Sequence, residues 1–550
     1  MYGNFESPVV RGVFTKLKTV FNLHWPPSFF LVVAYIVIAI IKLFLVSDQG
    51  LFSYYGPHDD LLYLRHAESI LNGQWLGDYN NLTLAKGVGY PLWIALSNLL
   101  SVDLLLAQHI LYILACFLFV LAISPSLSSN RWRIVLFMLL VFNPISYADT
   151  VGNRVIRDGI YPALVLMVFS LIILIHSAIS RYQRKPIFLS LSLGLSFFFF
   201  WVTREEGIWL LPAILVLISG LLMLQVKAFR VRFFIFVVVI PVVQVFLLIS
   251  SLMYLNYKHY GVYVHNDVKS GSFVSAYSAL QRLKTEDVNR LELPAHTRGV
   301  LYDLSPSFAQ LKDTLDDSRK WWFTGKEDIH NGMFIWGFRD AVKERGYYAD
   351  AYTSEMFYRR ITEEINSACL QNVALCRERR ETLSPSLRSM SLNDLTAQFI
   401  DAAYFLLRFD GFKAKSSVYS LSNKAQLFFI EMTGERVSHS GAPDTVQHDI
   451  MNGIKSFYSF FLSLGTVLSV GIWVYILSRG AINNEFSLVV ATTLLVTGLR
   501  LGLVSVMHIV SFNTISVLYI ASAYPFAIAF CVLTPALALS VLTRAEGGKV

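Results

Sequence analysis

Apolar runs alternate with short polar or basic connectors along most of the chain. About ten runs of roughly 16 to 25 residues are predominantly apolar, and each is long enough to cross a hydrocarbon core about 30 Å thick. In chain order they fall at 29–46, 104–123, 132–148, 160–179, 187–202, 207–224, 233–255, 453–477, 485–508 and 514–539. The pattern predicts an α-helical polytopic membrane protein with about ten transmembrane helices.

The stretch between residues 256 and 450 departs from this pattern. It is polar and carries aromatic clusters such as Trp321-Trp322-Phe323. We expect it to fold as a mainly helical domain outside the membrane. The chain then divides into an N-terminal transmembrane module (1–255) with an outward loop (47–101), this extracytoplasmic domain (256–450) and C-terminal transmembrane helices (451–550).

The composition excludes an ordinary soluble enzyme. Of the 550 residues, 55% are hydrophobic and 15% are charged, whereas a typical soluble domain is about one quarter charged. Residues 256–450 hold 24 basic and 25 acidic side chains, and the rest of the chain holds 22 and 13, so the net charge of +8 arises beside the apolar runs. Basic residues at the ends of membrane spans report orientation. The expected partner is therefore the lipid bilayer, and no nucleic acid is expected.

The basic connectors agree on one orientation. Threading the ten runs in order places the basic groups at 11–18, 131–133, 181–185, 227–232, 479 and 544–549 on the same side of the membrane. The positive-inside rule makes this the cytoplasmic side. Both termini are then cytoplasmic, and the loop 47–101 and the domain 256–450 face outward.

Two of the four cysteines lie in the expected outward domain. Cys369 and Cys376 are close together there, while Cys116 and Cys531 fall in spans. An exported location is an oxidising one, which favours a disulfide between Cys369 and Cys376. The alternative is two reduced cysteines in the core of the domain.

The first outward loop holds an acidic pair. Asp59 and Asp60 follow His58 and open a short amphipathic helix that ends at Asn72-Gly73. A carboxylate just above the bilayer can act as a general base for an acceptor hydroxyl, or can hold a metal ion such as Mg²⁺ or Mn²⁺. The alternative is that the two acids only cap the helix.

Further ionisable groups fall on the same outward side. An ionisable group at membrane depth is costly, and by default it marks a functional site. Arginines, together with a lysine that opens a Lys-Gly-x-Gly turn, suit a phosphate ligand because guanidinium groups bind it bidentately. The alternative for each group is a structural ion pair, for example Arg204 with Asp158. The groups are Lys86, Arg154, Arg157, Arg204, Glu205 and Arg500.

With these motifs the chain resembles the GT-C superfamily of integral-membrane glycosyltransferases, and in particular a bacterial branch of it. The similar features are the acidic pair after the first span, the turn from Lys86 to Pro91, Thr-Arg-Glu-Glu-Gly at 203–207 and Leu-Tyr-x-x-x-x-Tyr-Pro at 518–525. The likeness covers roughly 29–255 and 453–540. GT-C enzymes transfer a sugar from a polyprenyl-phosphate or polyprenyl-pyrophosphate carrier on the outer face of a membrane.

The resemblance implies a role for each candidate residue. Asp59 would activate the acceptor hydroxyl, and Asp60 would orient it or contact a metal ion. Lys86, Arg204 and Arg500 would hold the donor phosphate. The remaining substrate-binding candidates are His58, Tyr90, Arg154, Arg157 and Glu205. It also implies a bacterial inner membrane as the location.

One departure leaves the acceptor open. Where protein mannosyltransferases and aminoarabinose transferases carry a Lys/His-Pro-Pro turn, this chain has Lys86-Gly87-Val88-Gly89. The acceptor can therefore be a glycan, a lipid or a protein of the cell envelope. Other functions that fit the charged outward groups are a transporter or flippase of lipid-linked saccharides, and an oligosaccharide polymerase or ligase.

Overall fold

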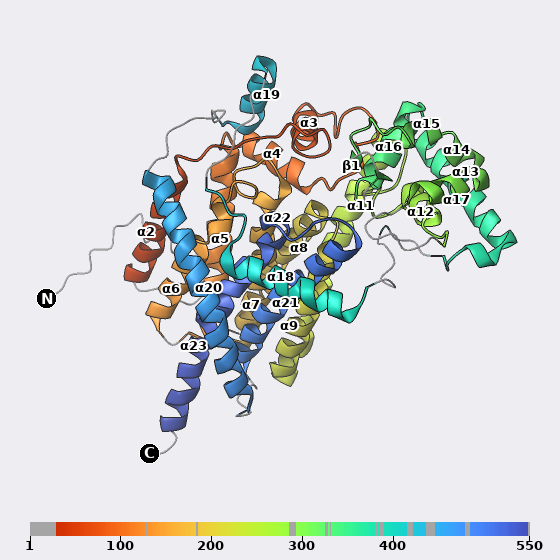
Figure 1. Cartoon of the computed structure of the whole chain (residues 1–550). Helices are drawn as coiled ribbons and strands as arrows, with labels where there is room; N and C mark the ends of the chain where they lie inside the picture. The colour runs from red at the N-terminus through yellow and green to blue at the C-terminus, as the bar shows by residue number, and fades with distance from the viewer. Residues whose placement is uncertain are drawn as a thin grey trace.

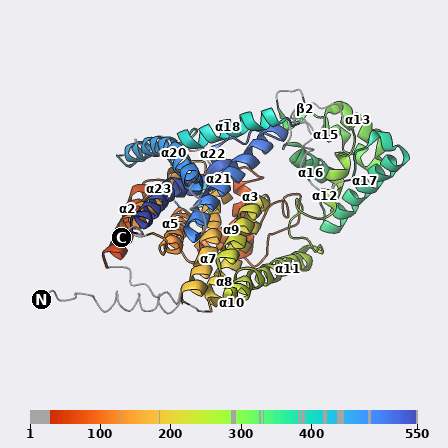
Figure 2. The same cartoon turned by 90° about the horizontal axis from the view of Figure 1, so that it is seen from below.

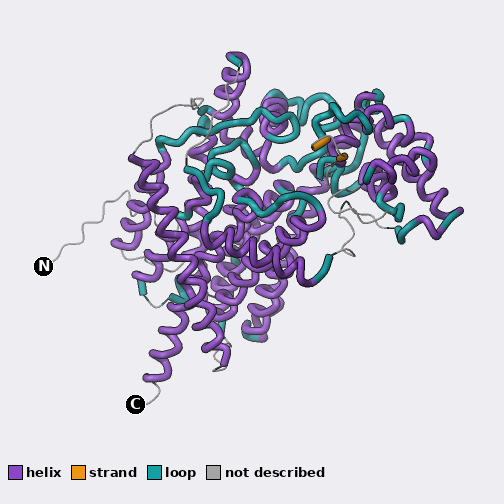
Figure 3. Tube along the Cα trace, in the orientation of Figure 1, coloured by secondary structure: helices purple, strands orange, loops and turns teal. Residues whose placement is uncertain are grey.

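The structure is a computed structural model and describes residues 29–127, 129–182, 185–284, 293–324, 328–329, 332–379, 383, 390–414, 422–435, 446–478 and 484–547. Of the basic groups that set the expected orientation, those at 11–18, 184, 479 and 549 lie outside these residues. The described chain is mostly helical, with loops between the helices and one pair of two-residue strands (Figure 3).

The N-terminal part holds the helices α2 (Phe29–Val46), α3 (Asp60–Leu71), α4 (Gly89–Leu99), α5 (Leu104–Ile123), α6 (Asn130–Val141), α7 (Tyr161–Tyr182), α8 (Ile187–Thr203), α9 (Leu211–Leu224), α10 (Lys227–Phe234) and α11 (Ile240–Tyr260). Four short helical turns join them: η1 (Pro144–Tyr147), η2 (Arg157–Gly159), η3 (Gly207–Leu210) and η4 (Ile235–Val239).

The middle part holds α12 (Ser272–Leu280), α13 (Ala295–Leu304), α14 (Pro306–Ala309), α15 (Lys312–Leu315), α16 (Phe334–Glu344), α17 (Ala351–Gln371) and η5 (Val373–Leu375), with β1 (Phe323–Thr324) antiparallel to β2 (Asp328–Ile329). The C-terminal part holds α18 (Leu392–Arg408), α19 (Asn423–Thr433), α20 (Val446–Ser478), α21 (Glu485–Val510), α22 (Val517–Ile520), η7 (Ala521–Ala523) and α23 (Tyr524–Gly547).

Eight helical segments of the described chain are long and apolar enough to cross a membrane, which confirms a helical polytopic membrane protein. All ten expected runs are largely helical, but two of them are shorter than the rest. Helix α8 has 17 residues, and α6 has only 12 because the chain reaches Asn143-Pro144 and turns into η1. Proline cannot continue an α-helix in its interior. At 1.5 Å per residue, α6 covers about 18 Å, less than the hydrocarbon thickness.

The spanning helices form one bundle (Figure 1). Helices α7 and α23 lie at its centre with most of their side chains covered by neighbours, whereas α11 and α20 turn most of their side chains outward. This is the arrangement expected in lipid, where outward apolar residues meet hydrocarbon and need no protein partner. The loop that contains α3 and the helix α4 lie together at one end of the bundle (Figure 1).

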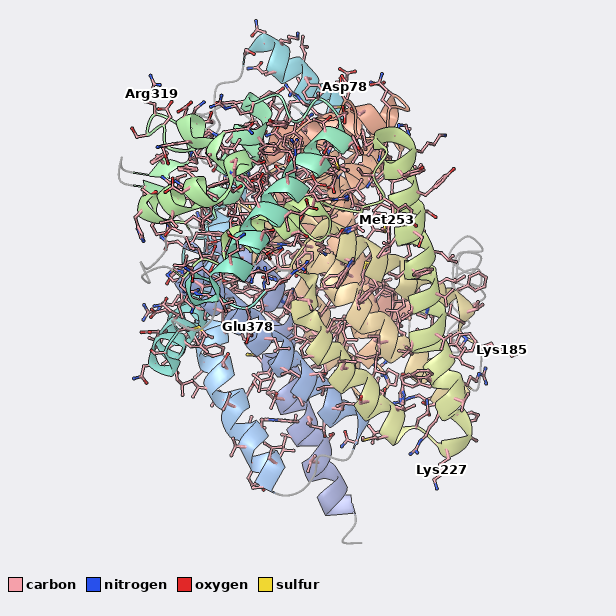
Figure 4. The ribbon with its side chains drawn as sticks, turned by 90° about the vertical axis from the view of Figure 1, so that its right-hand side faces the viewer. Asp78, Lys185, Lys227, Met253, Arg319 and Glu378 are labelled. Atoms are coloured by element: carbon pink, nitrogen blue, oxygen red, sulfur yellow. A yellow bond between two sulfur atoms is a disulfide. The ribbon has the colours of Figure 1, made fainter. Side chains whose placement is uncertain are left out.

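The two ends of the bundle differ in the residues that they carry. Figure 4 places Asp78 at one end, and Lys227 at the opposite end. Lys185 lies toward the Lys227 end in the same view. The end with Lys227 and Lys185 is the one expected to face the cytoplasm.

Cysteine labelling in intact cells checks this orientation. Single cysteines at Asp78 and Arg319 should react with an impermeant maleimide, because both positions are exposed at the expected outward face. Cysteines at Lys185 and Lys227 should react only after the membrane is opened. Labelling of Lys185→Cys and Lys227→Cys in intact cells would show that the orientation is the opposite of the expected one. The native Cys116 and Cys531 are buried and give a low background.

The middle part has a hydrophobic core of its own beside the bundle (Figures 1 and 2). Aromatic and aliphatic side chains from α12, α16 and α17 fill it, among them Phe273, Phe338, Phe357 and Ile361. The described residues between 262 and 378 therefore form a separate helical unit, which we call the outer domain.

Helices α18 and α19 differ from the expected division of the chain. Helix α18 packs against α20 and α21, and its Ala402 and Leu406 belong to the core of the bundle, not to that of the outer domain. Helix α19 packs against α3 and α4. The reason is the apolar stripe of α18: an amphipathic helix buries that face against the nearest apolar surface.

The structure joins Cys369 and Cys376 by a disulfide that links the end of α17 to the residue after η5. Closing so short a loop should stabilise the outer domain by about 2 to 3 kcal/mol, on a chain-entropy model. We expect Cys369→Ser to lower the melting temperature of the purified protein. Peptide mapping without a reductant should recover the two cysteines as one cross-linked fragment, and free thiols at both positions would rule the bond out.

Candidate functional site

Asp59 and Lys86 form an ion pair at the end of the bundle that carries α3 and α4. The ammonium group of Lys86 donates a hydrogen bond to Oδ1 of Asp59. The Asp59 side chain is 40% exposed, and that of Lys86 is 10% exposed. Although Asp59 is the residue that precedes α3, its carboxylate makes no capping hydrogen bond to that helix. Helix capping therefore does not explain Asp59.

Asp60 has a different environment from its neighbour. Its carboxylate is fully buried and accepts hydrogen bonds from the guanidinium of Arg154 at 2.5 to 3.2 Å and from the backbone N–H of Tyr54 at 2.6 Å. A buried carboxylate that is satisfied in this way holds two chain segments together. Asp60 thus fixes the position of Arg154, whose guanidinium also lies 3.9 Å from Asp59.

The turn that carries Lys86 packs directly against the end of α8. A Cβ atom on Gly87 would lie 2.1 Å from the carbonyl oxygen of Val202, and one on Gly89 would lie 2.3 Å from Oγ1 of Thr203. Only glycine permits so close an approach. The two glycines therefore allow the turn to bring Lys86 beside the 204–206 junction.

The 204–206 junction adds three more ion pairs to the site. Arg157 pairs with Glu205, whose other oxygen accepts the backbone N–H of Gly87 at 3.1 Å. Arg204 is almost fully buried and pairs with Asp158 and, at 2.6 Å, with Glu206. The structural ion pair between Arg204 and Asp158, which the sequence left open, is therefore present.

Arg500 is the buried cation that differs from the others. Its side chain is 1% exposed, its Nε–H donates to the carbonyl oxygen of Tyr519 at 2.6 Å, and its guanidinium lies 5.2 Å from the ring of Trp209. Within the described residues its Nη1 has no hydrogen-bond partner. Tyr519 also places its ring 5.3 Å from the guanidinium of Arg204, so the two arginines are neighbours.

Lys269 is a member of the site that no sequence signal indicated. It comes from the outer domain. Its ammonium donates a hydrogen bond of 3.4 Å to the backbone carbonyl oxygen of Trp201 and lies 4.3 Å from the centre of the indole ring of the same residue. Burial lowers the pKa of Lys269, while the carboxylate of Glu205 acts in the opposite direction. Tertiary packing alone brings this lysine to the junction.

These groups form what we call the charged cluster. Its carboxylates each have a cation within 4.0 Å, whereas Arg500 and Lys269 have no such partner among the described residues. The cluster therefore has surplus positive charge, which favours an anionic ligand. Its members are Asp59, Asp60, Lys86, Arg154, Arg157, Asp158, Arg204, Glu205, Glu206, Lys269 and Arg500.

The charges around Asp59 keep it ionised. Burial raises the pKa of its carboxyl group, but the adjacent Lys86 ammonium, helped by Arg154 and Arg157, has the larger combined effect and holds the pKa below its usual value. Burial lowers the pKa of Lys86, and Asp59 opposes this shift. At neutral pH, Asp59 is therefore ionised.

Two of the expected site residues lie elsewhere. The hydroxyl group of Tyr90 donates to Gln108 at 3.1 Å, and its fully buried ring packs edge-on against Tyr63, so it is part of the core beneath the site. The ring of His58 turns toward the outer domain, where it contacts Trp321 and Trp336.

The two carboxylates named as metal-binding candidates are both paired with cations in this structure. Asp59 and Asp60 both face cations, and among the described residues no group of three or more His, Cys, Asp or Glu side chains could hold a metal ion.

No protein-family model matches this chain, and no curated protein matches it. Among solved structures, it is similar to the crystal structure of ArnT from Cupriavidus metallidurans in the apo state. The two share 12% sequence identity over 92% of this chain and 76% of that one, with a TM-score of 0.29. At this level the likeness identifies neither an activity nor a substrate.

Proposed function

We propose that this protein is a GT-C-type glycosyltransferase of a bacterial inner membrane. It moves a sugar from a polyprenyl-phosphate or polyprenyl-pyrophosphate carrier to a hydroxyl group of a cell-envelope molecule on the outer face. The support comes from the residues of the charged cluster and from the motifs in the first outward loop.

One observation carries the proposal: the contrast between Asp59 and Asp60. Asp60 is fully buried and saturated with hydrogen bonds, whereas Asp59 is partly exposed and held by Lys86. A general base must be reachable by the group that it deprotonates, and Asp59 meets this requirement. Lys86 is also a cation that a donor phosphate would attract, and a donor that draws it away would leave Asp59 free.

The transfer step follows from these positions. The acceptor oxygen attacks the anomeric carbon of the donor and passes its proton to the carboxylate of Asp59. The bond between that carbon and the phosphate oxygen breaks, and the electron pair leaves with the polyprenyl phosphate. Lys86 and Arg500 stabilise the charge that develops on this leaving group, in a region from which water is largely excluded.

Purified protein tests the proposal against its alternatives. Lipid-linked sugars and envelope material are extracted from cells that lack the protein, mixed with the detergent-solubilised protein, and analysed by mass spectrometry. A transferase should release polyprenyl phosphate and add one sugar to the envelope material, although no sealed compartment is present. A transporter or flippase would leave both substrates unchanged.

The product separates a transferase from a polymerase or ligase. Addition of a single sugar residue supports transfer from a monosaccharide carrier, whereas addition of an oligosaccharide would indicate a ligase. Absence of any transfer with wild-type protein that still binds the lipid carrier would contradict the proposal.

A further inference from the structure

An aromatic group extends from the site to the surface of the outer domain. The ring of His58 lies 4.8 Å from the ring of Trp321 and 5.0 Å from that of Trp336. The ring of Trp336 lies 5.4 Å from the ammonium of Lys86, which binds Asp59. The three rings therefore connect the proposed base to the outer domain without interruption.

Trp321 is the outermost member of this group. Half of its surface is exposed, whereas its neighbour Trp322 is 1% exposed and belongs to the core of the outer domain. Single exposed apolar residues are common on protein surfaces. Trp321 differs from that ordinary case because its ring contacts His58, and the rings of His58 and Trp336 connect it to the pair of Lys86 and Asp59.

Asp340 gives this exposed ring a polar edge. The indole N–H of Trp321 donates to Oδ2 of Asp340 at 3.1 Å, and the amide of Asn81 donates to its Oδ1 at 2.6 Å. His58 Nε2 lies 3.8 Å from Oδ2. An ionised carboxylate accepts about four hydrogen bonds, so Asp340 keeps acceptor capacity beside the ring.

The first loop and the outer domain are fixed to each other at this place. Arg339 donates to the carbonyl oxygen of Asn81 at 2.7 Å and to Asp267 at 2.8 Å. Tyr79 and Ser354 share a hydrogen bond of 2.8 Å. The rings from α16 and the β1 region are thus held in register with Asp59, as a binding site requires.

The chemistry of this surface matches that of a sugar ring. A pyranose has an apolar face of C–H groups, which packs on an aromatic ring, and a rim of hydroxyl groups, which donate to a carboxylate. An aliphatic lipid chain has no hydrogen-bond donor for the carboxylate of Asp340. A hydroxyl group on a peptide has no apolar face that would pack on the ring of Trp321. The arrangement therefore favours a saccharide.

We propose that Trp321, Trp336 and Asp340 form the acceptor subsite, and that the acceptor is a carbohydrate. This inference rests on the proposed function. A sugar unit stacks on Trp321 and donates hydroxyl hydrogens to Asp340, and the row of rings directs the glycan toward Asp59. The hydroxyl that receives the new sugar belongs to a residue of the same glycan.

Binding measurements on the full-length protein in lipid nanodiscs test this inference. The probe is the set of water-soluble oligosaccharides released by hydrolysis from the envelope of cells that lack the protein. Saturation-transfer NMR with irradiation of aromatic protons should transfer magnetisation to the sugar ring protons of the probe. Trp321→Ala should weaken this binding by about tenfold, and Trp321→Phe should restore most of it because the flat face remains.

A matched control separates this site from general surface contacts. Tyr352 is 73% exposed on α17 of the same domain, so Tyr352→Ala removes an exposed aromatic ring elsewhere. It should bind the probe like the wild type. An equal loss in Tyr352→Ala and Trp321→Ala would overturn the inference, and so would a Trp321→Ala variant that binds normally.

The same preparations distinguish this inference from the proposed function. Binding of polyprenyl phosphate is measured in parallel, and Trp321→Ala should leave it unchanged. If the lipid phosphate binds and no oligosaccharide does, the acceptor is a lipid or a protein and the inference is wrong, while the proposed function stands. If the oligosaccharides bind and the lipid phosphate does not, the proposed function fails and the saccharide site remains.

Discussion

Asp59→Asn should lower the rate of sugar transfer by roughly 10² to 10⁴, the usual contribution of a general base. Asparagine keeps the size of the side chain but cannot accept the acceptor's proton. Because the Asp59 carboxylate makes no capping bond to α3, loss of a cap cannot account for such a decrease. The measurement is single-turnover transfer by purified protein, with polyprenyl phosphate binding recorded on the same sample.

Donor binding should be as strong as in the wild type, or stronger. The substitution removes a negative charge beside Lys86, and a donor phosphate would no longer compete with Asp59 for that cation. Transfer at a rate near that of the wild type would show that the proposed mechanism is wrong, whatever the fold.

Asp60→Asn is the natural comparison, and it should behave differently. Asp60 is fully buried, and its loss as a charged partner leaves the guanidinium of Arg154 without its main ion pair. Removing one member of a buried ion pair typically costs about 3 to 5 kcal/mol. We expect a lower melting temperature and reduced yield for Asp60→Asn, whereas Asp59→Asn should fold normally.

The sequence predicted the membrane architecture well because lipid imposes strict rules. A spanning helix must be long and apolar, and its connectors show their charge in the sequence. The end of α6 after 12 residues was present in the sequence as Asn143-Pro144, a helix-breaking pair, but the apolar residues on both sides of that pair resemble one continuous run. The division of residues 256–450 was also hidden. Whether α18 joins the bundle or the outer domain depends on the surface that lies opposite its apolar stripe.

The charged cluster was only partly visible in the sequence. An ionisable group at membrane depth is costly and by default marks a functional site, so Lys86, Arg204 and Arg500 could be identified as site candidates. Their partners could not be assigned, because each ion pair joins segments that are far apart in the chain. Lys269 and Asp340 lie among ordinary charged residues of a polar domain, and only the packing of that domain against the first loop brings them to the site.

Arg204 and Arg500, which the sequence did not distinguish, have different partners in the structure. Arg204 is bound by Asp158 and Glu206, which is the environment of a structural group. Arg500 is equally buried, but in the described part of the chain no carboxylate lies within 4.0 Å of its guanidinium. A buried guanidinium without a carboxylate is costly for folding. An arginine at position 500 is explained if a donor phosphate completes the hydrogen bonds of its guanidinium.

Arg500→Met should therefore weaken the binding of polyprenyl phosphate by roughly 10- to 150-fold, because a hydrogen bond to a charged group contributes about 1.5 to 3 kcal/mol. The melting temperature without ligand should stay the same or rise, since methionine replaces an unpaired buried charge at the cost of one hydrogen bond to Tyr519. Carrier binding is measured by calorimetry in nanodiscs, and unfolding by a thermal scan.

Arg204→Met, at an equally buried position, should give the opposite result. It leaves the carboxylates of Asp158 and Glu206 without their cation, so it should destabilise the fold by about 3 to 5 kcal/mol. If Arg500→Met instead lowers the melting temperature and leaves carrier affinity unchanged, Arg500 is structural, and the surplus charge of the cluster does not serve the donor. Because the two substitutions remove the same group from neighbouring positions of similar burial, a difference between them can arise only from what each guanidinium binds.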